Sequence, residues 1–257
     1  MKRFCKHGSY PDYYVDRYKG VMADPRLKLL EETGNVQRLF TGKKVLDIGC
    51  NAGDLTHAVA MKYDPASVLG IDVDASLVRR ALKKARWCDA TPAEQACGDL
   101  STLADPLTLG GEPAAAGEHT VHEVGTPKLG FRKEDFSLHM HGDCAYDTIM
   151  ALSVTKWVHL ERGDEGMKFF FEKVHALLKR GGLFLMEPQP WSSYSKNKNT
   201  SETSSTNYKS LRLRPTDFTA ILLEEVGFRE CWHLGTPSGR ASCQGKGFDR
   251  PLHIFMR

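Results

Sequence analysis

The chain lacks several features that would assign it to common classes of protein. It has no run of about 18 apolar residues, the length that a helix needs to span a bilayer. No apolar stretch follows Lys2 and Arg3, so we expect neither a membrane partner nor a secretory signal. Its seven cysteines include no C-x-x-C pair, which favours free thiols in an intracellular, reducing compartment. The net charge is only +3, so total charge does not predict a nucleic-acid partner.

Metal-binding clusters are also scarce. His139, His141 and Cys144 come nearest to one, but a loop that leads into a strand explains them better, so we expect no bound metal. The 257 residues suit one α/β domain, and 41% hydrophobic with 26% charged residues is typical of a globular chain. We therefore expect a single domain over 1–257.

The strongest local pattern is KKVLDIGCNAGD, residues 43–54. Its apolar run 45–48 is typical of a strand buried on both faces, and apolar residues then recur at helical spacing. Gly49 and Gly53 lie in the loop between them, where a ligand approaches the backbone. The glycine spacing of a dinucleotide-binding loop is missing. Asp47 lies at the carboxyl end of the strand, where it repels phosphate and attracts an ammonium or sulfonium group.

This loop resembles motif I of the S-adenosylmethionine-dependent methyltransferases. A second strand, residues 67–74, contains Asp72 about 25 residues after Asp47, the distance at which such units hold a ribose hydroxyl. A third strand near 128–131 has an acidic end that is a candidate for the adenine amino group, although a solvated turn explains it nearly as well. The resemblance implies S-adenosylmethionine as cofactor, with S-adenosylhomocysteine as product. The expected contacts in this part of the chain are Asp47, Gly49, Asn51, Gly53, Asp72, Val73, Asp74, Asp135, Phe136 and Leu152.

Periodic patterns predict the remaining elements. We expect helices over 26–39 (a helix or turn), 77–85, 163–179 and 218–222. We expect further strands over 146–152, 183–186, 231–234 and 252–256, the last two as an antiparallel pair. Periodicity is lost over 88–126, a predicted flexible insertion, and 192–210 is a polar tract with no core-forming capacity. The order predicts an α/β, Rossmann-like, seven-stranded class I methyltransferase sheet, mostly parallel with an antiparallel C-terminal strand.

Three further stretches converge on one rim of this sheet: SVTKWVHL over 153–160, EPQPWSSY over 187–194 and KGFDRP over 246–251. With Tyr13 and Arg17 of the aromatic and basic segment 1–20, they resemble the methylphosphate capping enzymes, which methylate the 5′ phosphate of small RNAs. The match covers nearly the whole chain except 88–126 and part of 197–206. It implies that Tyr13 and Arg17 close over the cofactor, whereas the residues alone slightly favour a frayed terminus.

The resemblance implies methyl transfer to the 5′-terminal γ-phosphate of a small non-coding RNA, since GFDRP is closer to the triphosphate-capping branch. A terminal phosphate oxygen is anionic near neutral pH, its second pKa being about 6, so no general base is needed. The site must position the oxygen with cations and hydroxyls. The expected catalytic residues are Lys156, Lys196, Arg250 and Tyr194. The other expected substrate contacts are Arg17, Trp157, His159, Glu187, Gln189, Trp191, Ser192, Arg214 and Lys246.

The sequence leaves several alternatives open. Trp157 can belong to the core, His159 is more often a structural histidine than a base, and Glu187 either orients a substrate lysine or pairs on the surface. The tract 192–210 is a candidate for ordering on RNA binding. A 5′-monophosphate RNA methyltransferase, or an RNA-binding scaffold that retains the cofactor fold, are the competing functions. The resemblance alone implies a nuclear or cytoplasmic location and RNA-binding protein partners.

Overall fold

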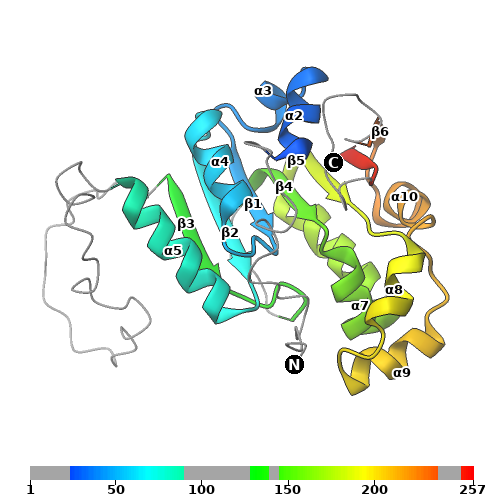
Figure 1. Ribbon diagram of the computed structural model, residues 1–257. Helices are drawn as coiled ribbons and strands as arrows, with labels where there is room; N and C mark the ends of the chain where they lie inside the picture. Colours follow the sequence, from blue (N-terminus) through cyan, green and yellow to red (C-terminus); the bar gives the residue numbers. More distant parts are fainter. Residues whose placement is uncertain (1–23, 90–127, 139–144, 237–249) are drawn as a thin grey trace, which may run out of the picture.

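A computed structural model describes residues 24–89, 128–138, 145–236 and 250–257 (Figure 1). Their centre is a seven-stranded sheet with the order β3-β2-β1-β4-β5-β7-β6. The strands are β1 (Lys44–Ile48), β2 (Ser67–Asp72), β3 (Leu129–Lys133), β4 (Tyr146–Leu152), β5 (Leu178–Glu187), β6 (Glu230–Gly235) and β7 (Leu252–Met256).

The direction of the strands confirms the predicted fold class. Strands β3, β2, β1, β4 and β5 are parallel to their neighbours. Strand β7 lies between β5 and β6 and is antiparallel to both, as expected for the closing pair. The carboxyl ends of the parallel strands meet at one edge of the sheet, where ligands of such folds bind. Because β7 runs the other way, Arg250, just before its amino end, lies at that same edge.

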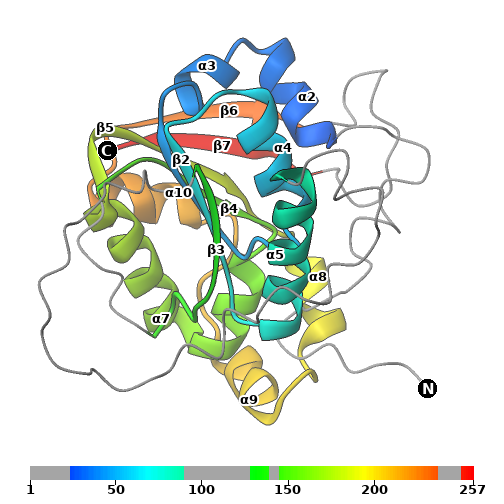
Figure 2. The same ribbon diagram turned by 90° about the vertical axis from the view of Figure 1, so that its left-hand side faces the viewer.

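Helices cover both faces of the sheet (Figure 2). The elements are α2 (Pro25–Glu32), α3 (Val36–Leu39), α4 (Asp54–Lys62), α5 (Ala75–Asp89), α7 (Thr155–Leu177), α8 (Trp191–Asn197), α9 (Glu202–Ser210), α10 (Phe218–Ala220) and the π-helical turn η3 (Ile221–Val226). Alternate strand residues serve different faces. In β5, Leu183 and Leu185 pack with α2 to α4, whereas Phe184 and Met186 pack with α7 and η3.

Two predicted elements differ from the structure. The helix expected over 163–179 begins at Thr155, continues past a non-helical Gly163 and ends at Leu177. Strand β5 begins at the next residue, so Gly181 and Gly182 lie within the strand rather than ending the helix. Apolar spacing alone missed the first two turns because glycine interrupts the pattern at 163.

The polar tract 192–210 is also different from its prediction. It contains helices α8 and α9, and Tyr194 and Ser204 within it are buried. Tyr194 packs in a cluster with Leu160 and Leu211. The tract therefore contributes to a small core through aromatic residues that its serines and lysines mask in composition. Of the insertion 88–126, residues 90–126 lie outside the described residues, so its predicted flexibility stays a prediction. In the part of the chain that the structure describes, no helix is long and apolar enough to cross a bilayer.

Candidate active site

A cavity lies at the carboxyl edge of the sheet, between the ends of β1, β2, β3 and β4 and the first turns of α7. Most of the predicted cofactor residues line it. They are Gly49, Asn51, Asp72, Val73, Asp135, Phe136 and Leu152. Trp157, a predicted substrate contact, also lines the cavity and is half-buried. These residues therefore share one cavity wall, and their contacts with the cofactor stay predictions.

The loop after β1 is held tightly against β2. Its backbone turns through positive φ angles at Gly49 (73°) and Asn51 (55°), a region that favours glycine. A Cβ atom on Gly49 would lie 2.4 Å from Cγ2 of Val154, so this position excludes any larger residue. The carboxylate of Asp72 accepts hydrogen bonds from the backbone nitrogens of Asn51 and Asp74, each at 2.9 Å. Burial nevertheless raises the pKa of Asp72.

Asp47 lies behind the loop and does not line the cavity. It is 3% exposed, and its Oδ2 accepts a hydrogen bond of 2.7 Å from Oγ1 of Thr56. Burial raises the pKa of Asp47 to about 6, although the hydrogen bond from Thr56 and the charge of Arg26 oppose this. The predicted direct contact with the donor does not fit this position. Asp47 instead places a negative charge within the wall.

Gly53 and Asp74 also do not line the cavity. Gly53 precedes α4 with φ 77°, and a Cβ atom there would meet the Phe131 ring at 2.8 Å and Cβ of Ala81 at 2.9 Å. Its glycine permits close packing of α4 on the sheet rather than the approach of a ligand. Asp74 begins α5, where its carboxylate accepts from Ser76 N at 2.7 Å and satisfies an otherwise unpaired donor at the helix start.

Asp135, which follows β3, also lines the cavity, and hydrogen bonds fix its carboxylate in place. Its Oδ1 accepts from Ser137 N at 3.0 Å, and its Oδ2 accepts from Nη2 of Arg162 at 2.8 Å. Burial raises the pKa of Asp135, but the hydrogen bonds from Ser137 and the charge of Arg162 outweigh it, and the net pKa is lowered. Asp135 is therefore a carboxylate that stays ionised at neutral pH.

A buried ion network brings Arg250 to the cavity. Glu187 is fully buried, and its Oε2 accepts from Nη1 of Arg26 at 3.2 Å and from Oγ of Ser153 at 2.6 Å. Nη1 of Arg250 donates to the same Ser153 hydroxyl at 2.7 Å. Arg26 is also paired with Asp24 at 2.7 Å. Neither alternative for Glu187 fits: it pairs inside the protein with Arg26, and Ser153 links it to Arg250.

Lys156 lies at the start of α7 beside Trp157. Its Nζ donates to Oδ1 of Asn197 at 2.8 Å and lies 4.2 Å from the centre of the Trp157 ring. Gln189 accepts from Thr155 Oγ1 at 3.1 Å and from Lys156 N at 3.0 Å. Gln189 is 2% exposed, so the predicted substrate contact does not fit. Gln189, which follows β5, instead fixes the start of α7.

His159 and Tyr194 face the interior rather than the rim. Both are fully buried. Nδ1 of His159 lies 3.3 Å from the Tyr194 hydroxyl, and its Nε2 lies 2.8 Å from Oδ1 of Asp164. Burial lowers the pKa of His159, despite the opposing carboxylate of Asp164, and raises that of Tyr194. The predicted roles of Tyr194 as a phosphate donor and of His159 as a substrate contact do not fit. Both residues hold α8 against α7.

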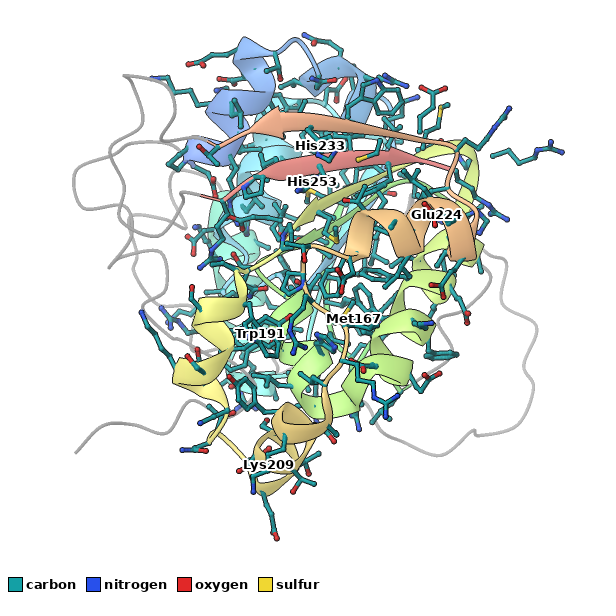
Figure 3. All side chains as sticks on the ribbon, turned by 90° about the vertical axis from the view of Figure 1, so that its right-hand side faces the viewer. Met167, Trp191, Lys209, Glu224, His233 and His253 are labelled. Atoms are coloured by element: carbon teal, nitrogen blue, oxygen red, sulfur yellow. The ribbon has the colours of Figure 1, made fainter. Side chains whose placement is uncertain are left out.

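Trp191, labelled in Figure 3, begins α8, and its ring stacks with that of Tyr208 on α9. The Trp191 ring lies 5.3 Å from the Tyr208 ring at an angle of 10°, and Cζ of Arg214 lies 4.0 Å from the Trp191 centroid. Nη1 of Arg214 also donates to the backbone carbonyls of residues 211–213, so Arg214 is engaged within the protein. Ser192 and Lys196 are exposed on α8 and stay predicted substrate contacts.

Tyr13, Arg17 and Lys246 lie outside the described residues, as do the histidines and cysteine of 139–144. Their predicted roles stay predictions.

Three residues of the site were missed in the sequence. Ser153 directly follows a buried strand within SVTKWVHL, a position from which it could have been predicted. Arg162 lies two turns further along α7 and could have been found only from the true start of that helix. Arg26 reaches Glu187 from 161 positions away, and no local pattern carries that information.

Comparison with known proteins identifies the family to which the chain belongs. Residues 46–184 match a family model described as a methyltransferase domain, and residues 146–257 match that of Bicoid-interacting protein 3 (Bin3). A probable RNA methyltransferase of Arabidopsis thaliana is 40% identical over 97% of this chain and 80% of its own length. The U6 snRNA methylphosphate capping enzyme Amus of Drosophila melanogaster is 33% identical over 98% of this chain and 75% of its own length. The chain belongs to the methyltransferase family that contains the methylphosphate capping enzymes.

The family was therefore identified correctly from its motifs. The human 7SK snRNA methylphosphate capping enzyme is 31% identical over the whole of this chain, which spans 40% of that protein's length. Among solved structures, the N-methyltransferase NodS of Bradyrhizobium japonicum in complex with S-adenosylhomocysteine has a TM-score of 0.52 and 14% identity, covering 94% of this chain and 92% of that one. This similarity shows the class I methyltransferase fold.

Proposed function

We propose that this chain transfers a methyl group from S-adenosylmethionine to the 5′-terminal γ-phosphate of a small non-coding RNA. The observation that carries the proposal is that two cations contact residues of the cavity wall: Arg250 donates to Ser153, and Lys156 lies over the Trp157 ring. RNA as substrate is supported by the names of the relatives, which act on 7SK and U6 snRNA. The γ-phosphate is supported by the GFDRP run, residues 247–251.

The cavity fits the proposed donor. Ile71, Phe136 and Leu152 give it apolar walls, which suit a flat purine. Asp72 and Asp135 add carboxylates that suit hydroxyl and amino groups. When bound, S-adenosylmethionine supplies a methyl group that a sulfonium makes electrophilic. The negative charges in and behind the wall favour such a cation over a phosphate.

The chain's own residues act on the RNA end. Arg250 is fixed through Ser153 and Glu187, so its guanidinium is held in place to bind a phosphate with parallel hydrogen bonds. Lys156 is 6% exposed and donates to Asn197, so it adds positive charge beside Trp157 rather than a freely exposed contact. The Trp157 ring offers a face on which a base can stack. The attacking phosphate oxygen is already anionic near neutral pH. These residues therefore need only position it, and His159, with both ring nitrogens engaged, is not required as a base.

The direct test compares three RNA ends. A short transcript with a 5′-triphosphate, a 5′-monophosphate or a 5′-hydroxyl is incubated with the protein and labelled donor. We expect label on the triphosphate RNA and its loss after phosphatase treatment before the reaction. Preferential labelling of the monophosphate RNA would overturn the γ-phosphate, and binding of all three without any labelling would support a scaffold instead.

A matched pair of variants tests the role of Arg250. Arg250→Gln should lower kcat/KM by about 10- to 100-fold, since a hydrogen bond to a charged group contributes about 1.5–3 kcal/mol. Arg229→Gln is the control, because Arg229 is exposed just before β6, at the opposite edge of the sheet. Equal activity in the two variants would remove Arg250 from the site.

A nuclear location and protein partners stay proposals that rest on the family alone.

A further inference from the structure

Three side chains of metal-binding type lie together on the β6–β7 pair, separated from the cavity by β5. Cys231 and His233 are two residues apart on β6, so they lie on the same face of the strand. His253 is directly opposite His233 in the antiparallel register. Figure 3 shows the two histidines on neighbouring strands. One ligand atom from each of the three residues lies within 4.8 Å of the others.

The three side chains lie near enough to one another to share a zinc ion. With Zn–N bonds near 2.05 Å and Zn–S bonds near 2.3 Å, a tetrahedral ion holds its donor atoms about 3.3–3.6 Å apart. Sγ of Cys231 lies 3.8 Å from Nε2 of His233. On its other side, Nδ1 of His233 lies 2.6 Å from Nδ1 of His253, a hydrogen-bond distance. A zinc ion takes only one nitrogen of His233, so binding requires this hydrogen bond to open and the exposed His233 ring to turn one nitrogen towards the ion.

The three side chains differ in burial, so the group has a buried, fixed side and a side that is open to solvent. His253 is 9% exposed, and its ring stacks on Phe255 at 6.1 Å. Cys231 is half-buried and packs against the core on the α7 side of the sheet. His233 is exposed, which gives an ion a path from solvent. One thiolate and two imidazoles are the donors that zinc prefers among common cellular divalent ions.

We propose that Cys231, His233 and His253 bind a zinc ion. Within the described residues three ligands form the group, which leaves a fourth position for water. The ion joins β6 to β7 three residues after Arg250, so it stiffens the strand that carries this arginine to the cavity. The site does not depend on the proposed RNA chemistry, because its ligands lie outside the cavity.

The test is a titration of the full chain, first freed of metal by a chelator, with Co²⁺ followed by Zn²⁺. Co²⁺ bound to a thiolate in a tetrahedral site gives ligand-to-metal charge-transfer absorption and strong visible bands, which Zn²⁺ abolishes on displacing it. We expect these bands at one equivalent, together with a rise in Tm on adding Zn²⁺. Absence of the bands would overturn the proposal.

Variants assign the ligands. Even the loss of an outer partner lowers metal affinity by about 10- to 100-fold, so Cys231→Ser and His233→Gln should each weaken Co²⁺ binding by at least that factor. Cys50→Ser and His175→Gln are the thiol and imidazole controls, since both residues lie on other elements, and they should bind Co²⁺ like the parent. His233 is exposed, so its variant remains informative if Cys231→Ser fails to fold. Parent-like binding by His233→Gln would overturn the site.

Discussion

Replacing Asp47 with asparagine should remove a pH-dependent penalty from the stability of the ligand-free protein. Asp47 is buried, and burial raises the pKa of its carboxyl from 3.8 to about 6. Each pKa unit corresponds to about 1.4 kcal/mol, so ionising Asp47 in the folded protein costs about 3 kcal/mol more than in the unfolded chain. That is a substantial part of a total stability of about 5–15 kcal/mol.

The direction in which stability changes with pH follows from the raised pKa of Asp47. At about pH 3 and below, the carboxyl is protonated in both the folded and the unfolded chain, and Asp47 carries no penalty. The penalty grows as the pH rises from the unfolded pKa, 3.8, to the folded pKa, about 6, and is constant above the folded pKa. The stability of the parent relative to Asp47→Asn should therefore fall by about 3 kcal/mol between about pH 3 and pH 7.5.

Urea unfolding of the two proteins across this pH range measures the effect. The new amide can leave one N–H without a partner, at a cost of about 1–3 kcal/mol, but that cost is the same at every pH and cancels from the trend. The same variant should bind S-adenosylmethionine more weakly in calorimetry, since it removes a negative charge near the donor. A pH-independent difference in stability would show that Asp47 ionises normally and would refute the reasoning.

Three other predictions concern packing and charge. Gly49→Ala should destabilise the fold by about 1–3 kcal/mol, because its Cβ would lie 2.4 Å from Cγ2 of Val154. It should also abolish cofactor binding in calorimetry, and parent-like affinity would contradict this. Arg26→Met leaves Glu187 buried without its cation and should lower the free energy of unfolding by about 3–5 kcal/mol, measured in urea. The double variant Arg26→Met/Glu187→Gln should recover part of this loss. No recovery would argue against the Arg26–Glu187 ion pair. Phe171→Ala, at a fully buried position outside the cavity wall, should cost about 3–5 kcal/mol while the folded variant keeps its cofactor affinity.

The parallel part of the fold could be predicted because its signals are local. Val45, Leu46 and Ile48 form a short apolar run, and Gly49 follows where the backbone needs a positive φ. A strand buried on both faces and the loop after it therefore appear within ten residues of sequence. The same reasoning placed Asp72 in the second predicted strand, and β2 ends at this residue. These elements make most of the cavity wall.

The cationic side of the site could not be predicted as well, because it depends on contacts between distant residues. Tyr194 lies in a run of serines and lysines, and its contacts with Leu160 and Leu211, both outside its own helix, explain its burial. Glu187 is the last residue of strand β5, a position common for surface carboxylates, yet Arg26 from α2 neutralises it. Residue type and spacing identify which side chains can act, whereas their direction depends on tertiary packing.

The network of Arg26, Glu187, Ser153 and Arg250 also sets the boundaries of any useful fragment of this protein. A shorter piece that begins at β1 would keep the glycine loop and every strand, yet it would leave the carboxylate of Glu187 enclosed without Arg26. Such a piece should express poorly or aggregate, since an unpaired enclosed charge destabilises the fold that surrounds it. Fragments for crystallisation or binding studies should therefore begin before Asp24, upstream of the helix that carries the arginine.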